Sequence, residues 1–153
     1  MRAVVQRVLS SKVTVDGRIC GAIGPGMTVL LGISKEDTEK DADYLVKKLS
    51  GLRIFDDAEG VMNLNAFDAF PNQQPEILAV SQFTLYGDVR KGNRPSYIMA
   101  EIPEKARLLY TYFTAQLKAA GFHVETGIFQ ADMQVDIQNN GPVTILLDSF
   151  KTF

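Results

Sequence analysis

The sequence has little of the chemistry that most often marks a metal site or a nucleophilic enzyme. It contains one histidine, His123, and one cysteine, Cys20, among 153 residues. That is too few soft ligands for a structural zinc site. A single cysteine forms no internal disulfide, which suits a reducing compartment. We therefore expect no metal and no other cofactor.

Neither of these two residues is a strong catalytic candidate. His123 lies between Phe122 and Val124 in an alternating pattern, which is typical of a half-exposed strand histidine. Cys20 lies among small and apolar residues, where a packed thiol is the simpler interpretation. No glycine-rich phosphate loop of either common spacing is present.

Long apolar runs are also missing. No uninterrupted apolar stretch approaches 18 residues, so we expect no membrane span. The segment Met1–Arg7 lacks the apolar core and the cleavage site of a secretory signal. Together with the single cysteine, this predicts a cytoplasmic protein.

Excess charge of one sign is absent as well. Sixteen Lys and Arg oppose 18 Asp and Glu, for a net charge of −2. That argues against a protein that coats a long stretch of nucleic acid, but not against a short contact with one RNA end. An apolar fraction of 46% excludes a disordered chain and fits one globular domain over residues 1–153.

The N-terminal third has the pattern of strands. Val-rich Arg2–Leu9 comes first, followed by alternating Lys12–Val15. Asp16-Gly17 is a strong hairpin signal, so Arg18–Ile23 is the expected return strand. The apolar run Met27–Ile33 predicts a buried strand.

Helical spacing occurs twice. Apolar residues fall at i, i+3, i+4 and i+7 within residues 42–49, with a capping residue at Thr38 and a stop at Gly51. The second helix begins at Pro103 and ends at Gly121.

The remaining apolar segments predict further strands, and Asn65–Pro75 has the composition of a loop. These strands are Leu52–Phe55, Glu76–Gln82, Phe122–Gly127, Met133–Asn139 and Val143–Ser149. Adjacent strand runs with two main helices indicate an α+β fold. We expect mostly antiparallel sheets that form a curved sandwich or barrel, with both helices packed outside.

One polar segment stands at the end of a predicted strand. Ser81, Gln82 and Thr84 follow an apolar run and precede a turn, a position suited to lining a cleft. On the pattern alone, side chains that face solvent or bond the local backbone are the simpler interpretation.

A second segment, Asn139–Thr144, contains the unusual pair Gly141 and Pro142. On the pattern alone a plain hairpin turn is favoured, although a bond before proline can be cis. The loop Asp88–Tyr97 carries three cations, which suit either a phosphate contact or a solvated surface.

Taken together, these segments resemble the D-aminoacyl-tRNA deacylase family over essentially the whole chain. The most specific matches are Ser81-Gln82-Phe83-Thr84, the S-Q-x-T motif, and Asn140-Gly141-Pro142-Val143-Thr144, the N-G-P-V-T motif. The blocks Gly92–Tyr97 and Gly127–Met133 also match. The chain departs from the family at Gln130, where glycine is expected, and its 66–75 loop is longer than usual. Ser81 favours the D-specific branch over a sister family that edits another mischarged tRNA.

The resemblance implies a homodimer with active sites at the subunit interface and no metal. The substrate would be the ester between a D-amino acid, or glycine mischarged on tRNA(Ala), and the terminal adenosine of tRNA. Gly141 and Pro142, joined in cis, would enter the partner's pocket and probe the substrate at Cα. Ser81, Gln82, Phe83 and Thr84 would form the catalytic wall, and Phe129 and Met133 would line the adenosine side.

Physical chemistry is compatible with such a site. An aminoacyl ester is already activated, so positioning and an oxyanion hole suffice, and one donor there contributes about 2.7–4 kcal/mol. Thr84 as nucleophile would need a base that the sequence does not place nearby, so assistance by the terminal 2′-OH of the tRNA is preferred. Rejection of L-substrates by a clash at Cα would leave glycine accepted. A sister-type editing enzyme and a non-catalytic module that binds RNA ends remain the alternatives.

Overall fold

The computed structural model describes residues 1–153. Its regular elements, in chain order, are β1 (Arg2–Val15), β2 (Arg18–Ile23), β3 (Gly26–Gly32), α1 (Glu39–Gly51), β4 (Phe55–Asp56), β5 (Met62–Leu64), α2 (Ala66–Ala69), β6 (Glu76–Ser81), the 3₁₀ turn η1 (Phe83–Tyr86), α3 (Pro103–Ala119), β7 (His123–Thr126) and β8 (Gln134–Asp148). None of the helices is both long enough and apolar enough to cross a membrane.

The main sheet is mixed and curls until its edges meet. Its strand order is β2-β1-β3-β6-β7, and β8 also pairs with β1. At the closure, a Cβ on Gly21 of β2 would lie 2.3 Å from the Thr126 carbonyl oxygen of β7. Glycine therefore lets these two strands touch, and the sheet is nearly closed into a barrel. The expected α+β barrel-like fold is confirmed.

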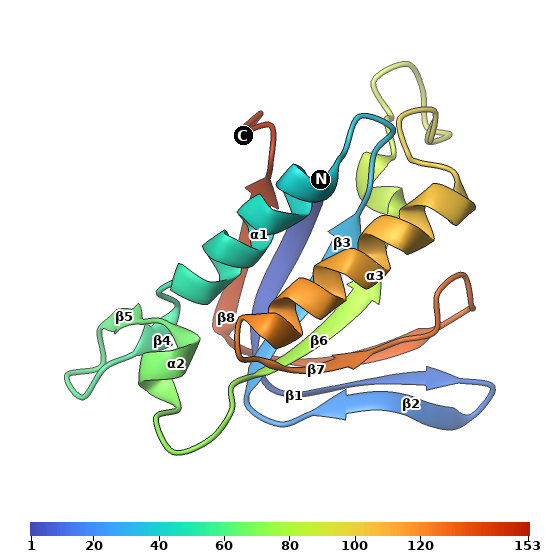
Figure 1. Cartoon of the computed structure of the whole chain (residues 1–153). Helices are drawn as coiled ribbons and strands as arrows, with labels where there is room; N and C mark the ends of the chain where they lie inside the picture. Colours follow the sequence, from blue (N-terminus) through green and yellow to red (C-terminus); the bar gives the residue numbers. More distant parts are fainter.

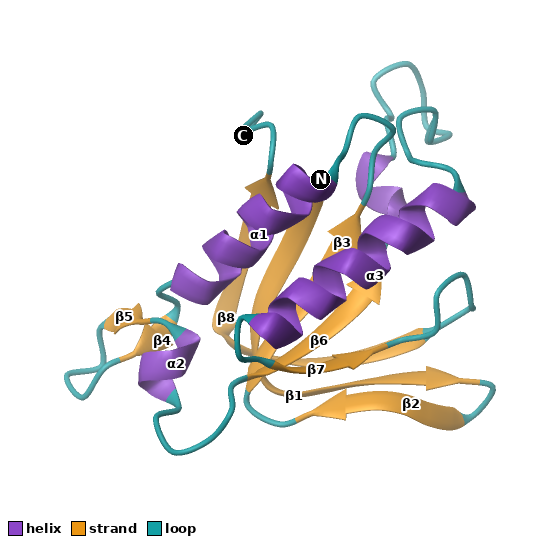
Figure 2. Cartoon of the chain, in the orientation of Figure 1, coloured by secondary structure: helices purple, strands orange, loops and turns teal.

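The two long helices cover one face of this sheet (Figures 1 and 2). The α1 helix begins at Thr38, whose backbone N–H donates to Asp41 at 2.9 Å in the predicted capping arrangement. Phe113 and Leu117 of α3 are fully buried in the cluster of 22 residues between helices and sheet. A second cluster of five residues fills the curled part of the sheet. Amphipathic spacing thus explains where both helices pack.

The predicted hairpin at Asn140-Gly141 is wrong. Residues 134–148 form one long strand, and both of its halves run antiparallel to β1. Gln6 pairs with Thr144 and Val8 with Asn139, so the intervening residues 140–143 bulge out of the ladder. The 14 residues of β1 are long enough to pair with both halves, and this pairing makes residues 134–148 one bulged strand instead of a hairpin.

Two further expectations needed correction. The segment Asn65–Pro75 contains the short helix α2, because the Asn65 side chain accepts from the backbone N–H of Phe67 and Asp68. The strand expected over Leu52–Phe55 begins only at Phe55. Most strand pairs are antiparallel, as expected. Two pairs, β3 with β6 and β6 with β7, are parallel, because helices cross over between the paired strands.

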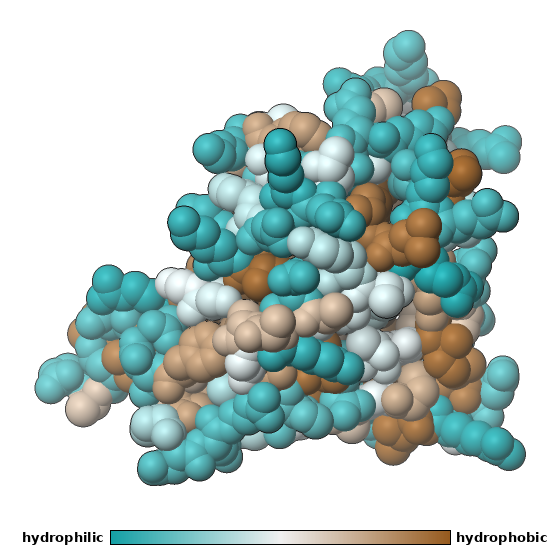
Figure 3. Space-filling model, in the orientation of Figure 1, coloured by the Kyte–Doolittle hydropathy of each residue, from teal (hydrophilic) through white to brown (hydrophobic).

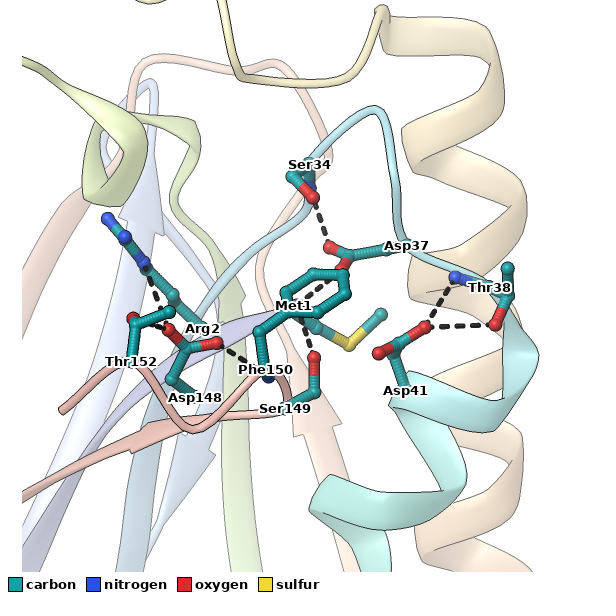
Figure 4. Close-up of polar contacts among 10 residues, drawn as sticks. All are labelled: Met1, Arg2, Ser34, Asp37, Thr38, Asp41, Asp148, Ser149, Phe150 and Thr152. Carbon is teal, nitrogen blue, oxygen red and sulfur yellow. Dashed lines mark hydrogen bonds and ion pairs between the residues drawn. The ribbon is translucent and has the colours of Figure 1, made fainter.

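A polar cluster fastens the start of β1 to neighbouring segments (Figure 4). The Met1 ammonium pairs with the Asp37 carboxylate, both side chains being fully buried, and donates to the Ser149 Oγ at 2.6 Å. Asp37 also accepts from the Ser34 backbone N–H at 2.6 Å, and burial raises the pKa of its carboxyl. The cluster fixes the loop that follows β3, which contributes Lys35 to the cavity described below.

Several large apolar side chains remain exposed near the beginning of α3. Leu108 is 72% exposed, Ile98 73% and Ile102 48%. Figure 3 shows apolar surface among hydrophilic surface on the helix face, including patches over α3. Such exposure beside a cavity is typical of a binding region.

Candidate functional site

A cavity of about 710 Å³ opens where the parallel strands β3 and β6 end. Its lining comes from four segments: the ends of β3 and β6, the Gln82-Phe83 turn, the stretch 97–103 that leads into α3, and residues 129–133 before β8. About 300–1,000 Å³ is the usual size of a small-molecule site. The carboxyl ends of neighbouring parallel strands are a usual place for one.

Ser81 and Gln82 are the polar part of one wall. Ser81 ends β6 opposite Leu31 of β3, and the Gln82 backbone N–H donates to the Leu31 oxygen at 2.7 Å. The Gln82 side-chain amide donates to the Thr84 hydroxyl. One amide N–H has thereby found a partner, and the second is left to donate toward a ligand.

Phe83 extends this wall toward solvent. Its side chain is 58% exposed, and its ring packs edge-on against Tyr97 at 5.0 Å between centroids. An exposed ring at a cavity mouth, held by a second aromatic ring, offers a stacking surface.

Thr84 lies outside the lining, although it is next to Phe83. Its side chain is exposed, and its hydroxyl accepts from Gln82, whose amide is not a base. The turn itself is anchored from β1: Arg2 Nη1 donates to the Leu85 oxygen at 3.1 Å, and the guanidinium lies 4.7 Å from the centre of the Tyr86 ring. The geometry positions this turn firmly but gives Thr84 no proton acceptor.

Phe129 and Met133 belong to a second part of the cavity wall, formed by residues 129–133. The Phe129 ring is 5.7 Å from the Tyr110 ring, whose hydroxyl donates to the Ala79 oxygen at 2.8 Å. A Cβ on Gly127 would lie 2.5 Å from the Met133 sulfur, so glycine leaves room for that side chain. Both walls are therefore built from side chains packed against the sheet.

Gly141 and Pro142 do not line this cavity. They lie in the exposed bulge of β8, and the bond between them is cis. Arg7 supports the bulge from β1: its Nε donates to the Asn140 oxygen at 3.1 Å and its Nη1 to the Ile54 oxygen at 2.8 Å. The single chain thus brings together five of the eight predicted site residues and leaves Thr84 and this pair outside.

Other lining residues were not anticipated from the sequence. Glu101, Ile102 and Asp132 line the cavity beside Tyr97 and Ile98. The available signals were the matched blocks that contain Tyr97 and Asp132 and the apolar residues directly before Pro103. His123 is exposed on β7 and pairs with Glu125 at 3.1 Å, away from the cavity, and the Cys20 thiol donates to the Val13 oxygen at 3.4 Å.

Comparison with known proteins establishes the family of this chain. The family model for D-Tyr-tRNA(Tyr) deacylases matches residues 4–148. The chain belongs to this family. Relatives named D-aminoacyl-tRNA deacylase, hydrolases of the aminoacyl-tRNA ester bond, are 57% identical in Koribacter versatilis (strain Ellin345) and 56% identical in Symbiobacterium thermophilum. Each alignment spans 153 residues and all of this chain, with 100% and 99% of the relative, respectively.

Two solved structures have the same deacylase fold. The c-Myc DNA Unwinding Element Binding Protein is 46% identical, with a TM-score of 0.88 over 97% of this chain and 98% of that chain. A probable eukaryotic D-amino acid tRNA deacylase is 18% identical, with a TM-score of 0.76 over 95% of this chain and 97% of that chain. The second likeness concerns the fold alone.

Proposed function

We propose that the chain hydrolyses the ester of D-aminoacyl-tRNA and releases the D-amino acid and tRNA in the cytoplasm. The observation that carries this is the cavity wall in which Ser81 and Gln82 stand beside the exposed ring of Phe83. Polar groups and a stacking surface at one wall suit a substrate with an ester carbonyl and an adenine base. Phe129 and Met133 would hold the adenosine from the other side.

Chiral selection is proposed to come from a second copy of the chain. Gly141 and Pro142 are exposed on β8, away from the cavity of their own subunit. In a homodimer, their carbonyls would enter the partner's cavity, bind the substrate amino group and crowd its Cα. An L-side chain would then clash, whereas glycyl-tRNA would be accepted. Specificity by exclusion is compatible with many different D-side chains.

The reaction is proposed to use the terminal 2′-OH of the tRNA rather than a protein nucleophile. The Thr84 hydroxyl accepts a hydrogen bond from Gln82 and has no basic partner to take its proton. The second N–H of the Gln82 amide would donate to the ester carbonyl as negative charge develops. The protein would supply position and donors, and the activated ester would supply the reactivity.

Activity is expected to persist when metal ions are removed. No group of three or more His, Cys, Asp or Glu side chains is placed to hold a metal ion. Deacylation of D-tyrosyl-tRNA after dialysis against EDTA should match the untreated rate within about twofold. Loss of activity that zinc or magnesium restores would contradict the mechanism.

A deacylation assay separates the three candidate functions. Release of tyrosine from D-tyrosyl-tRNA at substoichiometric enzyme is expected, and a module that only binds RNA ends would not turn over. Preferred hydrolysis of L-threonyl-tRNA in competition with the D-substrate would favour a sister-type editing enzyme instead.

A further inference from the structure

An arginine is held at the rim of the cavity by two contacts. Arg107 follows the cavity-lining Ala106 on α3. Its guanidinium carbon lies 4.9 Å from the centre of the Phe129 ring, and its Nη2 donates to the Gln130 Oε1 at 3.2 Å. Both contacting residues line the cavity. The guanidinium is therefore oriented before any ligand arrives.

The charge of this arginine is not neutralised within the chain. None of the ion pairs of the structure includes Arg107. The two carboxylates of the cavity lining, Glu101 and Asp132, stay beyond 4.0 Å, and Glu101 accepts from the Ile102 backbone N–H at 2.8 Å. By contrast, Arg90 in the nearby loop is paired with Asp88 at 2.6 Å. A guanidinium has five N–H donors, so most of those on Arg107 remain free.

Gln130 adopts an unfavourable backbone conformation in this arrangement. Its φ is +67°, a left-handed conformation that glycine adopts most readily. Its amide oxygen is the atom that receives the hydrogen bond from Arg107. A glycine at the same position would relax the backbone but would leave Arg107 supported by the Phe129 ring alone.

We propose that Arg107 binds a phosphodiester of the RNA, namely the one that precedes the terminal nucleoside. This rests on the proposed function, in which Phe129 lines the adenosine side of the cavity. The phosphate attached to that nucleoside must leave the cavity near its rim, where Arg107 contacts the lining residues Phe129 and Gln130. A planar, pre-oriented guanidinium with free donors suits bidentate contact with phosphate oxygens.

The test compares two substrates that differ in phosphate: D-tyrosyl-tRNA and D-tyrosyl-adenosine, which has none. Arg107→Ala should raise the KM for the tRNA about tenfold, as expected for a lost charged hydrogen bond, with kcat little changed. Its KM for the nucleoside ester should stay within about twofold, and the log–log salt slope for tRNA should become shallower by about 0.7. Gln130→Gly should raise the tRNA KM by a smaller factor without lowering Tm, because glycine suits its φ.

Lys105→Ala is the matched control. Lys105 is exposed on the same helix, but residues two positions apart do not share a helix face. This variant should retain the wild-type KM for both substrates. Equal increases in KM for both substrates in Arg107→Ala would mean that the arginine only supports Phe129, and a tRNA KM like that of Lys105→Ala would mean that it contacts no phosphate. Either result, obtained with an active wild-type enzyme, overturns the inference that Arg107 binds a phosphodiester. If the wild-type chain hydrolyses neither substrate, the proposed function fails first.

Discussion

Phe83→Ala is expected to raise the KM for D-tyrosyl-tRNA by roughly 5- to 150-fold, the range for loss of one base–aromatic stack of about 1–3 kcal/mol. The ring is 58% exposed at the cavity mouth and packs against Tyr97, so its removal opens no buried cavity. Tm should therefore change little. Phe153→Ala is a matched control, since that ring is 62% exposed and lies outside the cavity lining.

Substitution of the neighbouring residues Gln82 and Thr84 should reduce activity to different degrees. Gln82→Ala removes the free amide donor and should lower kcat, whereas Thr84→Ala should retain substantial activity because its hydroxyl has no base. Single-turnover rates for both variants and thermal melting would establish this order. A covalent acyl-Thr84 species, or a larger loss in Thr84→Ala than in Gln82→Ala, would show that the threonine is the nucleophile.

Gly141→Ala is expected to lower turnover of D-aminoacyl-tRNA by about tenfold or more. Gly141 has a φ of +131°, which a residue with a Cβ rarely adopts. The added Cβ would lie 2.7 Å from the Val143 Cγ2 and 3.2 Å from the Arg7 Nη2, so the bulge would have to move. The carbonyls proposed to enter the partner's cavity would then be displaced. The motif alone suggests that the added methyl group would clash with the substrate. The structure shows that it would also clash with Val143 and Arg7 of the same chain.

The damage should stay local, because the bulge lies outside the β1–β8 ladder and the flanking pairs are independent of it. Gly60→Ala is the matched control: Gly60 also has a positive φ, +75°, but an added Cβ would meet nothing within 4 Å. For both variants we would measure the deacylation rates of D- and L-tyrosyl-tRNA and the Tm. Sedimentation would show whether each variant forms the proposed homodimer. A Gly141→Ala protein with the wild-type rate and wild-type D-to-L ratio would mean that the bulge takes no part in selection.

The sequence predicted the secondary-structure elements that depend on interactions between residues close together in the chain. The spacing of residues 42–49 and the Thr38 cap identified α1, and Pro103 marked the start of α3. The Asn140-Gly141 signal failed because the local turn preference competes with backbone pairing along both halves of β8. The parallel pairs β3–β6 and β6–β7 depend on contacts between distant segments, which no local pattern contains.

In the candidate site, too, local sequence signals identified some residues, and others are brought in only by contacts between distant segments. For the polar residues at the end of β6, the pattern alone favoured side chains that face solvent, whereas the motif resemblance implied a wall of the site. Ser81 and Gln82 line the cavity. The stretch 97–103 joins them only because the chain returns over the ends of β3 and β6, and apart from Tyr97 its residues belonged to no matched block. Gln130 was noticed as a departure from glycine, but its bond to Arg107 became visible only when α3 was placed beside it.

The central claim is that this chain hydrolyses D-aminoacyl-tRNA and rejects the L-form. The most direct measurement is the rate of amino-acid release from D-tyrosyl-tRNA and L-tyrosyl-tRNA of the same tRNA preparation, at equal concentrations and in EDTA. We predict turnover of the D-substrate at least about 100-fold faster than that of the L-substrate, a difference of roughly 2.7 kcal/mol in transition-state binding. Equal rates for both, or no release above the uncatalysed background, would contradict it.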